Sequence, residues 1–503
     1  MKLQNRFCKK LISLLIKGKC LCLFGQCSLP TVNGDDVEYQ DMYTDTIPVD
    51  RNEKLAASQQ SNLVPCLLFM REHFECTNKN YIMKSLTKPV NKKWILLVCI
   101  FIFILSSCRK EIISNEQQQE LASVANNGKN ENKIYVSNLD QLYAAVNNPA
   151  NTGSVVVLAP GTYVLNASYP NAGRLELLEN MKLQGQPGHP GEVIIDASQL
   201  PGSSFVPPLN FPAPRTGAIR MGRGSNAIEW LTVKGNSSTQ ALSVIDTDLI
   251  WPGESKIKVA HSIITGGRIG IDLRNVGAAS VGRVLEAELV DNELVENLVQ
   301  FGQGIEVQNA NGASHAIIRA TLNGNYVHGN KIGMRSFNNN ANNSNTDFGN
   351  ISIQSNADRF EDNGIGIYFS AGLNQGSTTS ANGNLVRFEA HGTSIQNNTG
   401  TLPPENTPPC GIYAVAGQNT SGGTTSDNRL EINFWGCQIS GNRGADIIAF
   451  GAYSPTPLPA GTNNVAEIYL HGVSSNTIDI VTPSVPAEPA GTNKVNLFRY
   501  FFY

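Results

Sequence analysis

An asparagine recurs at a nearly constant interval through the second half of the chain, and this repeat restricts the fold more than any other feature. Each of these asparagines lies three residues after an apolar residue, and the series is Asn236, Asn297, Asn330, Asn363, Asn398, Asn442 and Asn476. The intervals are 61, 33, 33, 35, 44 and 34 residues, so the first interval holds two units and each later interval holds one. Such a period indicates a solenoid, in which each unit buries its apolar face against its neighbours.

The pattern inside a unit distinguishes a β-solenoid from a helical one. Residues 317–322, 386–390, 430–434 and 466–470 alternate apolar and polar side chains at period two, as half-buried strands do. Each unit is predicted to run through this strand, a tight glycine-containing bend, a short strand, the asparagine corner and a third strand such as residues 364–369. Because parallel crossovers strongly favour one hand, the predicted fold is all-β, a right-handed parallel β-helix.

The recurring asparagine is explained as a stacked corner residue. Asparagine tolerates the left-handed backbone conformation, and its side chain can bond the same residue one turn away. We expect the β-helix to span residues 133–503. Near its start, residues 138–146 combine an Asn N-cap candidate with apolar residues at helical spacing, so a short N-terminal capping helix is predicted.

The region before the repeat is read as three segments. In residues 83–108, four lysines precede twelve apolar residues, too few to span a bilayer in a helix and typical of a signal peptide. The apolar run ends in Leu-Ser-Ser-Cys108, which resembles the lipobox of bacterial lipoproteins and implies lipidation of Cys108. The polar residues 109–132 are interpreted as a flexible tether. Residues 1–82 are either a product of a start codon assigned upstream of Met83 or a cytoplasmic extension.

The numbers of cysteines and of charged residues restrict which metal sites and partners the chain can have. Only Cys410 and Cys437 lie after Cys108, and no Cys/His cluster indicates a zinc site; the two are small buried hydrophobes or a single disulfide. After Cys108, 24 Lys and Arg stand against 32 Asp and Glu, a balance that argues against a nucleic-acid partner. A polyanionic ligand would need a local basic patch or bridging metal ions such as calcium, for which no clear site is evident.

At this point the chain resembles the pectate-lyase-like β-helix superfamily over roughly residues 133–503. The resemblance covers the repeat, the early helix and the opening strand VVLAPGTY. It implies a polysaccharide lyase, a glycoside hydrolase, an esterase, an epimerase or a non-catalytic adhesin, and the fold alone does not choose among them. The Asn-Thr-Asp, Asp-Asp and Gly-His-Gly motifs of polygalacturonase-like enzymes are absent from the sequence. Asp246-Thr247-Asp248 is expected to lie in a loop.

Polar, glycine-rich insertions after the third strand of successive units are predicted to wall one face of the helix, unless they are tolerated surface variation. They are residues 337–350, 371–384, 416–429, 451–464 and 482–493. The outward residues of the strand that follows then form a strip. Its members, unit by unit, are Glu286 and Glu288; Arg319, Thr321 and Asn323; Ser352, Gln354 and Asn356; Arg387, Glu389 and His391; Glu431, Asn433 and Trp435; Glu467, Tyr469 and His471.

Strand spacing of about 4.8 Å predicts that equivalent side chains of this strip stack in columns, with Arg387, Glu431 and Glu467 in one and His391, Trp435 and His471 in another. Such a strip suits an extended glycan. The predicted ligand-binding residues are Arg319, Asn323, Asn356, Asn433, Trp435, Glu467, Tyr469 and His471.

Two mechanisms fit the predicted catalytic residues Arg387, Glu389, His391 and Glu431. In a lyase, Arg387 stabilises a uronate carboxylate while His391 or Tyr469 removes the adjacent proton. In a hydrolase, Glu389 and Glu431 lie roughly 7 to 9 Å apart, near the inverting separation. The alternatives are that Arg387 and Glu431 form only a cross-strand ion pair, and that the histidines are merely solvated.

The leading hypothesis from the sequence is therefore an exported, cell-envelope lipoprotein, held to a bacterial membrane through Cys108, that binds and possibly cleaves an extended polysaccharide. We expect a monomer. The alternative is a structural or adhesive β-helix without an active centre.

Overall fold

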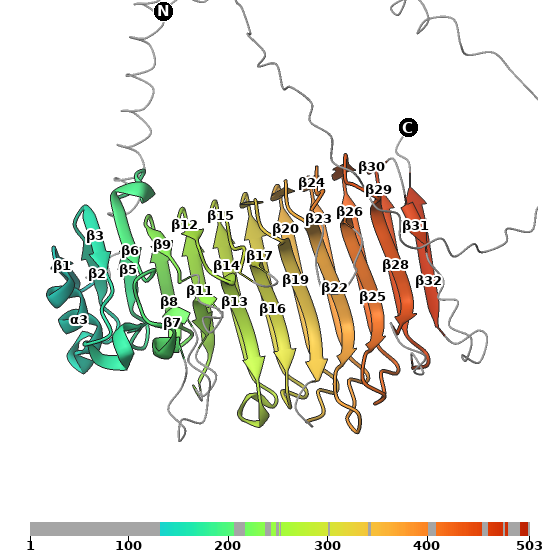
Figure 1. The fold of residues 1–503 in the computed structure, drawn as a ribbon, viewed down its shortest axis with the longest axis horizontal. Helices are drawn as coiled ribbons and strands as arrows, with labels where there is room; N and C mark the ends of the chain where they lie inside the picture. The colour runs from blue at the N-terminus through green and yellow to red at the C-terminus, as the bar shows by residue number, and fades with distance from the viewer. Residues whose placement is uncertain are drawn as a thin grey trace, which may run out of the picture. The chain divides into compact units, whose positions relative to one another are not determined.

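A computed structural model shows the repeat region as a parallel β-helix built from three sheets (Figure 1). The structure describes residues 131–205, 217–236, 243–247, 251, 253–299, 302–340, 344–400, 409–454, 461–475, 478–480 and 493–500. The segments predicted as upstream extension, signal peptide and most of the tether lie outside these residues. Within them, the predicted right-handed parallel β-helix is confirmed.

Every coil passes through sheets A, B and C in turn, and all strand pairs of the three sheets in the described chain are parallel. Sheet A consists of β1 (Lys133–Val136), β2 (Val155–Leu158), β5 (Lys182–Gln184), β8 (Gly224–Glu229), β11 (Ser255–Ala260), β14 (Val284–Val290), β17 (Ile317–Asn323), β20 (Asn350–Asn356), β23 (Leu385–His391), β26 (Arg429–Trp435), β29 (Val465–His471) and β32 (Lys494–Tyr500). Sheet B consists of β3 (Gly161–Val164), β6 (Val193–Asp196), β9 (Thr232–Lys234), β12 (Ile263–Thr265), β15 (Glu293–Val295), β18 (Tyr326–His328), β21 (Arg359–Glu361), β24 (Ser394–Gln396), β27 (Gln438–Ser440) and β30 (Ser474–Ser475).

Sheet C has the longest strands, and Figure 1 shows it in front. It consists of β4 (Leu175–Glu176), β7 (Gly217–Met221), β10 (Ser243–Thr247), β13 (Ile269–Val276), β16 (Gln303–Ala310), β19 (Ile332–Asn340), β22 (Ile365–Asn374), β25 (Cys410–Asn419), β28 (Ala445–Tyr453) and β31 (Ile478–Ile480). Five short 3-10 turns complete the described elements: η1 (Pro149–Asn151), η2 (Pro170–Gly173), η3 (Pro190–Glu192), η4 (Gly202–Phe205) and η5 (Ala278–Ser280).

One helix, α3 (Leu139–Asn147), lies near the first coil, as the sequence predicted. The Asn138 side chain caps it by accepting a hydrogen bond from the Gln141 backbone N–H. Its buried face packs into the same apolar core as β1 and β2. The helix therefore covers apolar side chains that a preceding coil would otherwise cover.

The interior is a set of apolar columns that run along the helix axis. Val327, Phe360, Ile395 and Ile439 are register partners on successive strands of sheet B, and all four are fully buried. Because each coil buries its side chains only against the coils on either side, the core grows with the number of coils rather than with their diameter.

The predicted asparagine ladder forms at the corner between sheets B and C. The Oδ1 atoms of Asn330, Asn363 and Asn398 each accept hydrogen bonds of 3.0–3.2 Å from the backbone N–H and Nδ2 of the asparagine one coil earlier. In the coil between Asn236 and Asn297, Gly267 takes the ladder position and its N–H donates to Asn297, which accounts for the double interval. Asn476 lies outside the described residues.

Two further ladders were not recognised in the sequence. At the corner between sheets A and B, Asn292 donates to Asn325, which donates to Asp358. Before sheet A, the ladder consists of Asn384, Asn428, Asn464 and Asn493. All three corners of the coil therefore use side-chain amides, or a carboxylate, to satisfy buried backbone N–H groups.

Two sequence predictions about loops are wrong. The insertions begin later than predicted, because β19, β22, β25 and β28 continue into them. The described parts of three insertions bond to one another: the N–H groups of Thr346 and Ala381 donate to the carbonyls of Ser380 and Thr424 one coil on. Most of the insertion at residues 482–493 lies outside the described residues. Asp246 and Thr247 lie in β10 rather than in a loop, because sheet C already includes this coil.

Replacing Asn330 by alanine should lower the free energy of unfolding by about 2 kcal/mol, because the buried N–H of Asn297 loses its acceptor. Chemical denaturation of the full chain measures this difference. The control is Gln354→Ala, which removes an exposed side chain of sheet A and should change stability by less than about 0.5 kcal/mol. Equal losses in both variants would contradict a stabilising ladder.

Candidate functional site

The predicted strip lies on the outward face of sheet A, and its columns are those expected from the sequence. Arg387, Glu431 and Glu467 are register partners on β23, β26 and β29. His391, Trp435 and His471 form the second predicted column, four residues further along the same three strands.

Charged groups of the strip are largely paired with one another. Arg387 Nε lies 2.7 Å from Glu431 Oε2, and Arg429 Nε lies 2.8 Å from the other oxygen of Glu431. Arg429 Nη2 also lies 2.7 Å from Glu467, and His391 Nε2 lies 3.0 Å from Glu389. The predicted catalytic set is thus brought together as a network of surface ion pairs.

The aromatic column of the strip presents ring edges rather than ring faces. Trp435 stacks on His471 with centroids 3.6 Å apart, His471 stacks on Tyr500 at 4.5 Å, and His391 lies parallel to Trp435 at 6.2 Å. Although Trp435 is 37% exposed, the ring face that a sugar would stack on is covered on one side by His471.

The other predicted ligand-binding residues of sheet A contact near neighbours. Arg319 lies 3.5 Å from Glu286, Asn356 donates to Asn323 at 2.7 Å, and Tyr469 stacks on Phe498 at 4.7 Å. Asn433 is the register partner of Tyr469. The ligand-binding roles assigned to these residues stay predictions.

Sheet C carries a second row of polar side chains that the sequence analysis missed. We call it the sheet-C row, and its members are Arg220, Asp246, Asp272, Glu306, Arg335 and Tyr368. Each follows an inward Ile or Met, so each points outward from the adjacent position. This repeated pair of an apolar residue and a polar one is the signal that could have revealed the row.

A dense ion-pair network holds the start of the row. Asp246 Oδ2 lies 3.1 Å from Arg220 Nη2 and 3.2 Å from Arg274 Nη2, and Arg274 Nε lies 3.3 Å from Asp272. The Ser243 hydroxyl donates to Asp272 at 2.9 Å. Burial alone would raise the pKa of Asp246, but Arg220 and Arg274 lower it to about 2, so this carboxylate is ionised.

Asp272 and Glu306 form a carboxyl pair on neighbouring strands. They are direct register partners, and Nε2 of Gln308 donates to both. Burial, followed by the charge of Asp272, raises the pKa of Glu306 to about 7, and burial likewise raises the pKa of Asp272. Two close carboxyl groups with little water around them cannot both ionise easily, so one proton is retained near neutral pH.

Cationic and aromatic groups border the carboxyl pair. The Arg335 guanidinium lies 4.4 Å from the ring centre of Phe337 and 5.1 Å from that of Tyr368. Arg268 lies close enough to Glu306 for the two charges to interact. Asp272 and Glu306 are 0% and 5% exposed, whereas Arg268 and Arg335 are only half-buried. A ligand therefore meets the guanidinium groups before the carboxyl pair.

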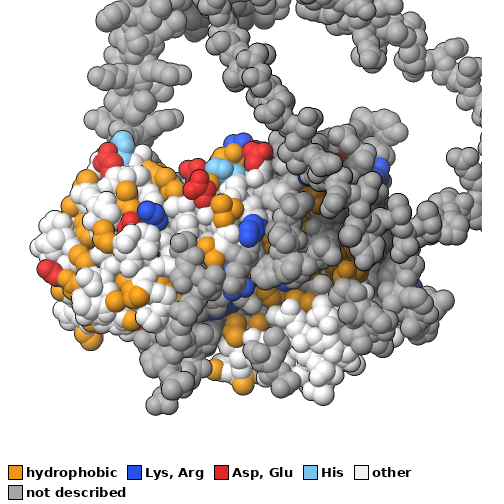
Figure 2. Space-filling view, viewed as in Figure 1, with side chains coloured by type: hydrophobic (Ala, Val, Ile, Leu, Met, Phe, Trp, Pro, Cys, Tyr) orange, Lys and Arg blue, Asp and Glu red, His pale blue; other side chains and the backbone are white. Residues whose placement is uncertain are grey.

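Locally, the sheet-C row reverses the charge balance of the predicted mature chain. Five arginines belong to or adjoin it, against four carboxyl groups; the arginines are Arg174, Arg220, Arg268, Arg274 and Arg335, and the carboxyl groups are those of Glu176, Asp246, Asp272 and Glu306. Figure 2, drawn from the same side as Figure 1, shows Lys and Arg atoms at several places across this face. With one carboxyl group protonated, the cluster carries a net positive charge, as the binding of an anion requires.

Among the described residues, no group of three or more His, Cys, Asp and Glu side chains is placed to hold a metal ion. Cys410 and Cys437 are buried free thiols, and burial raises the pKa of each. The expectation of two small buried hydrophobic residues is therefore confirmed, and the alternative of a single disulfide is not. In the described part of the chain, no helix combines the length and apolarity needed to cross a membrane.

Comparisons with known proteins give distant structural likenesses. The chain is similar to the A-module of a mannuronan C-5 epimerase from Azotobacter vinelandii, at 12% identity and a TM-score of 0.36, over 73% of this chain and 96% of the module. It is similar to a rice weevil pectin methyl esterase at 9% identity and a TM-score of 0.23, over 72% and 84% of the two chains. A surface adhesin of Streptococcus pneumoniae matches at 9% identity and a TM-score of 0.22, over 72% and 88%. No protein family and no curated sequence matches the chain.

The buried Glu306 should make stability fall as pH rises. Its folded pKa of about 7 exceeds the unfolded value near 4.3, so the folded state binds more protons between these pH values and its contribution is lost as pH passes 7. Denaturant unfolding at pH about 5 and about 8 should show this loss, and Glu306→Gln should reduce it. The exposed Glu389→Gln variant is the control. An identical pH dependence in Glu306→Gln and the unchanged chain would contradict the assignment.

Proposed function

We propose that the outward face of sheet C binds an extended acidic polysaccharide and that the chain acts on it by acid–base chemistry. The observation that carries this proposal is the Asp272–Glu306 carboxyl pair, which retains a proton near neutral pH beside several arginines. A buried, charged row of this kind is costly for a structure that only needs to stack its coils. A buried carboxyl group whose pKa is raised into the neutral range is typical of acid–base sites.

The geometry of the row suits a polymer rather than a small ligand. Its side chains repeat once per coil, at the strand spacing of about 4.8 Å, which is close to the length of one pyranose residue in an extended chain. An acidic glycan laid along the axis would meet Arg335 and Arg268 with its carboxylates. Tyr368 and Tyr413, stacked at 5.1 Å in the next two coils, extend the same outward column.

The chemistry follows from the groups present. Guanidinium groups would neutralise a uronate carboxylate, which makes the hydrogen on the adjacent carbon more acidic. Glu306, once it ionises as pH rises toward its pKa of about 7, would accept that proton. The electron pair forms a carbon–carbon double bond while the bond to the glycosidic oxygen breaks, and the protonated Asp272 supplies a proton to this leaving oxygen. The products are an unsaturated uronate and a shortened chain.

This proposal predicts cleavage of uronate-containing glycans with formation of unsaturated products, read as ultraviolet absorbance together with new reducing ends. Glu306→Gln should lower kcat/KM by at least about 100-fold, since it removes the general base. Activity of the unchanged chain should rise with pH up to about 7, as Glu306 ionises.

Arg387→Ala and Trp435→Ala are the matched controls, because they change the sheet-A strip and not the sheet-C row. Full activity in both, with loss in Glu306→Gln, supports sheet C. Loss in the sheet-A variants with full activity in Glu306→Gln would place the chemistry on the strip first predicted. No product from uronate or neutral glycans would favour the structural or adhesive alternative.

We also propose that the chain is exported and anchored to a bacterial cell envelope through Cys108. The support is the order of lysines, apolar run, small residues and cysteine in residues 83–108. In a bacterial host, the full chain should incorporate labelled fatty acid and fractionate with membranes, and Cys108→Ser should abolish both. Cys99→Ser, inside the apolar run, is the control. Labelling that persists in Cys108→Ser would contradict this assignment.

A further inference from the structure

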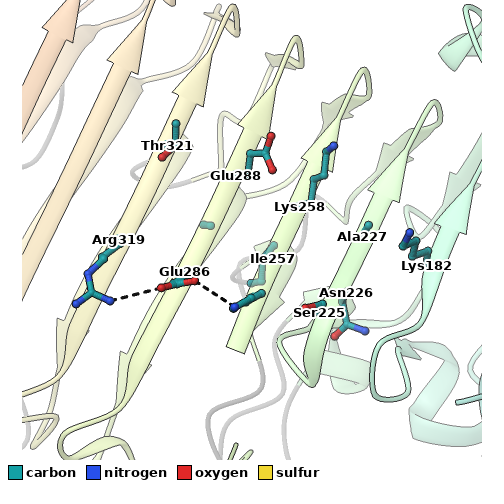
Figure 3. A pocket seen from close by; sticks show the side chains of 12 residues that line it. Lys182, Ser225, Asn226, Ala227, Ile257, Lys258, Glu286, Glu288, Arg319 and Thr321 are labelled. Atoms are coloured by element: carbon teal, nitrogen blue, oxygen red, sulfur yellow. Dashed lines mark hydrogen bonds and ion pairs between the residues drawn. The ribbon is translucent and has the colours of Figure 1, made fainter. Parts of the chain in front are cut away.

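Sheet A carries a depression in its first half, away from the sheet-C row and from the predicted strip's charged centre. Its volume is about 580 Å³, and its lining residues, drawn in Figure 3, lie on β5, β8, β11, β14 and β17. The side chains that argue for a ligand are Lys182, Ala227, Lys256, Lys258, Glu286 and Arg319.

The floor of the depression is narrow and the walls are basic. Ala227 is the register partner of both Lys182 and Lys258, so it lies between them, as Figure 3 shows. Two strand spacings separate the lysines, roughly 10 Å, and the short alanine side chain leaves the space between them open. Lys182 pairs with Glu131, on the side away from Ala227, at 3.0 Å, and Lys258 pairs with Glu229, two residues beyond Ala227 on β8, at 3.5 Å. Exposed pairs of this kind are weak and exchange readily for another anion.

The same strands end in an unusual corner. From β8 to β29, the residue after each sheet-A strand has a left-handed backbone; glycine holds this position in four coils, as Gly324, Gly392, Gly436 and Gly472, and Ala357 holds it in another. Three coils in the middle of the depression, those of β8, β11 and β14, instead place large or charged residues at this position: Trp230 with φ 60°, His261 with φ 51° and Asp291 with φ 48°. A bulky side chain in this conformation is strained, and such strain is typical of functional positions.

These corner residues form an aromatic surface. Trp230 and His261 stack with centroids 4.0 Å apart and planes 13° apart, and His261 Nδ1 lies 3.5 Å from Asp291. A shallow cavity of about 210 Å³ adjoins them, with Pro190 and Glu293 among its lining residues. Three residues along β8 separate Ala227 from Trp230, a distance of about 10 Å, so one ligand two sugar units long could contact both.

We propose that this surface is a second glycan-binding site, with a sugar carboxylate held between Lys182 and Lys258 and a pyranose ring against Trp230. This second site rests on the proposed function only for the class of its ligand, an acidic glycan. Because it lies on sheet A, it can hold one part of a long polymer while another part occupies sheet C. The site therefore raises affinity for long chains without taking part in cleavage.

The test is calorimetric titration of the full chain carrying Glu306→Gln, so that the glycan is not consumed. The probes are a hexameric oligouronate and a neutral glucan hexamer. Lys182→Ala with Lys258→Ala should weaken oligouronate binding at one of two sites by at least tenfold and leave the neutral probe unchanged. Lys133→Ala, an exposed lysine of the same sheet outside the depression, is the matched control and should bind as the parent does.

The Trp230→Gly variant distinguishes a role of Trp230 in ligand binding from a role in packing. Glycine relieves the left-handed strain, so the melting temperature should stay equal or rise, while oligouronate affinity falls at least tenfold. Lower melting temperature with unchanged affinity would overturn the proposal, because Trp230 would then be a packing residue.

The two proposals fail separately. If no glycan is cleaved but oligouronate binding still depends on Lys182 and Lys258, the second site stands and the proposed function falls. If cleavage occurs and the lysine and tryptophan variants bind normally at both sites, the second site is overturned and the proposed function stands.

Discussion

The hydrogen bonds between equivalent residues of successive coils are the interaction on which the structure depends. Corner residues bond to the coil that follows, through amide side chains such as Asn330, which donates to its counterpart Asn363, or through backbone N–H groups such as that of Gly392, which donates to the carbonyl of Trp435. A shift of one residue in any coil would leave buried N–H groups without acceptors and turn apolar side chains outward. The register is therefore fixed at the corners, and every outward column follows from it.

This constraint explains which parts of the molecule could be predicted from sequence. The sheet-A columns were predicted because strict alternation marks which residues face outward, and one asparagine ladder then set the register. The sheet-C row was missed because its strands are buried on both faces: the residues flanking Asp272 and Glu306 are apolar, and the run resembles a core strand. The Asn292–Asn325–Asp358 ladder was missed because the third member is a carboxylate, although the 33-residue spacing was present in the sequence.

Comparison of the two outward faces shows why charge alone is a poor guide to a site. On sheet A, Arg387, Arg429, Glu431 and Glu467 are partly exposed and neutralise one another in water, where such pairs contribute little. On sheet C, the same residue types are buried, so each uncompensated charge is costly and each pKa responds strongly to its neighbours. The groups suited to proton transfer therefore lie on sheet C, where charged residues are fewer but are buried away from water.

Corner residues that depart from the repeat pattern also bear on the function of sheet A. Four of the later coils use glycine at this corner, which adopts the left-handed conformation without steric cost, and one uses the small residue Ala357. Trp230 and His261 occupy equivalent corners at a conformational cost, and stacking of their rings offsets part of it. Because neighbouring coils make the same turn with glycine, the turn itself does not require a strained aromatic side chain at this corner. A strained aromatic pair beside an open basic depression is thus better explained by ligand contact than by folding.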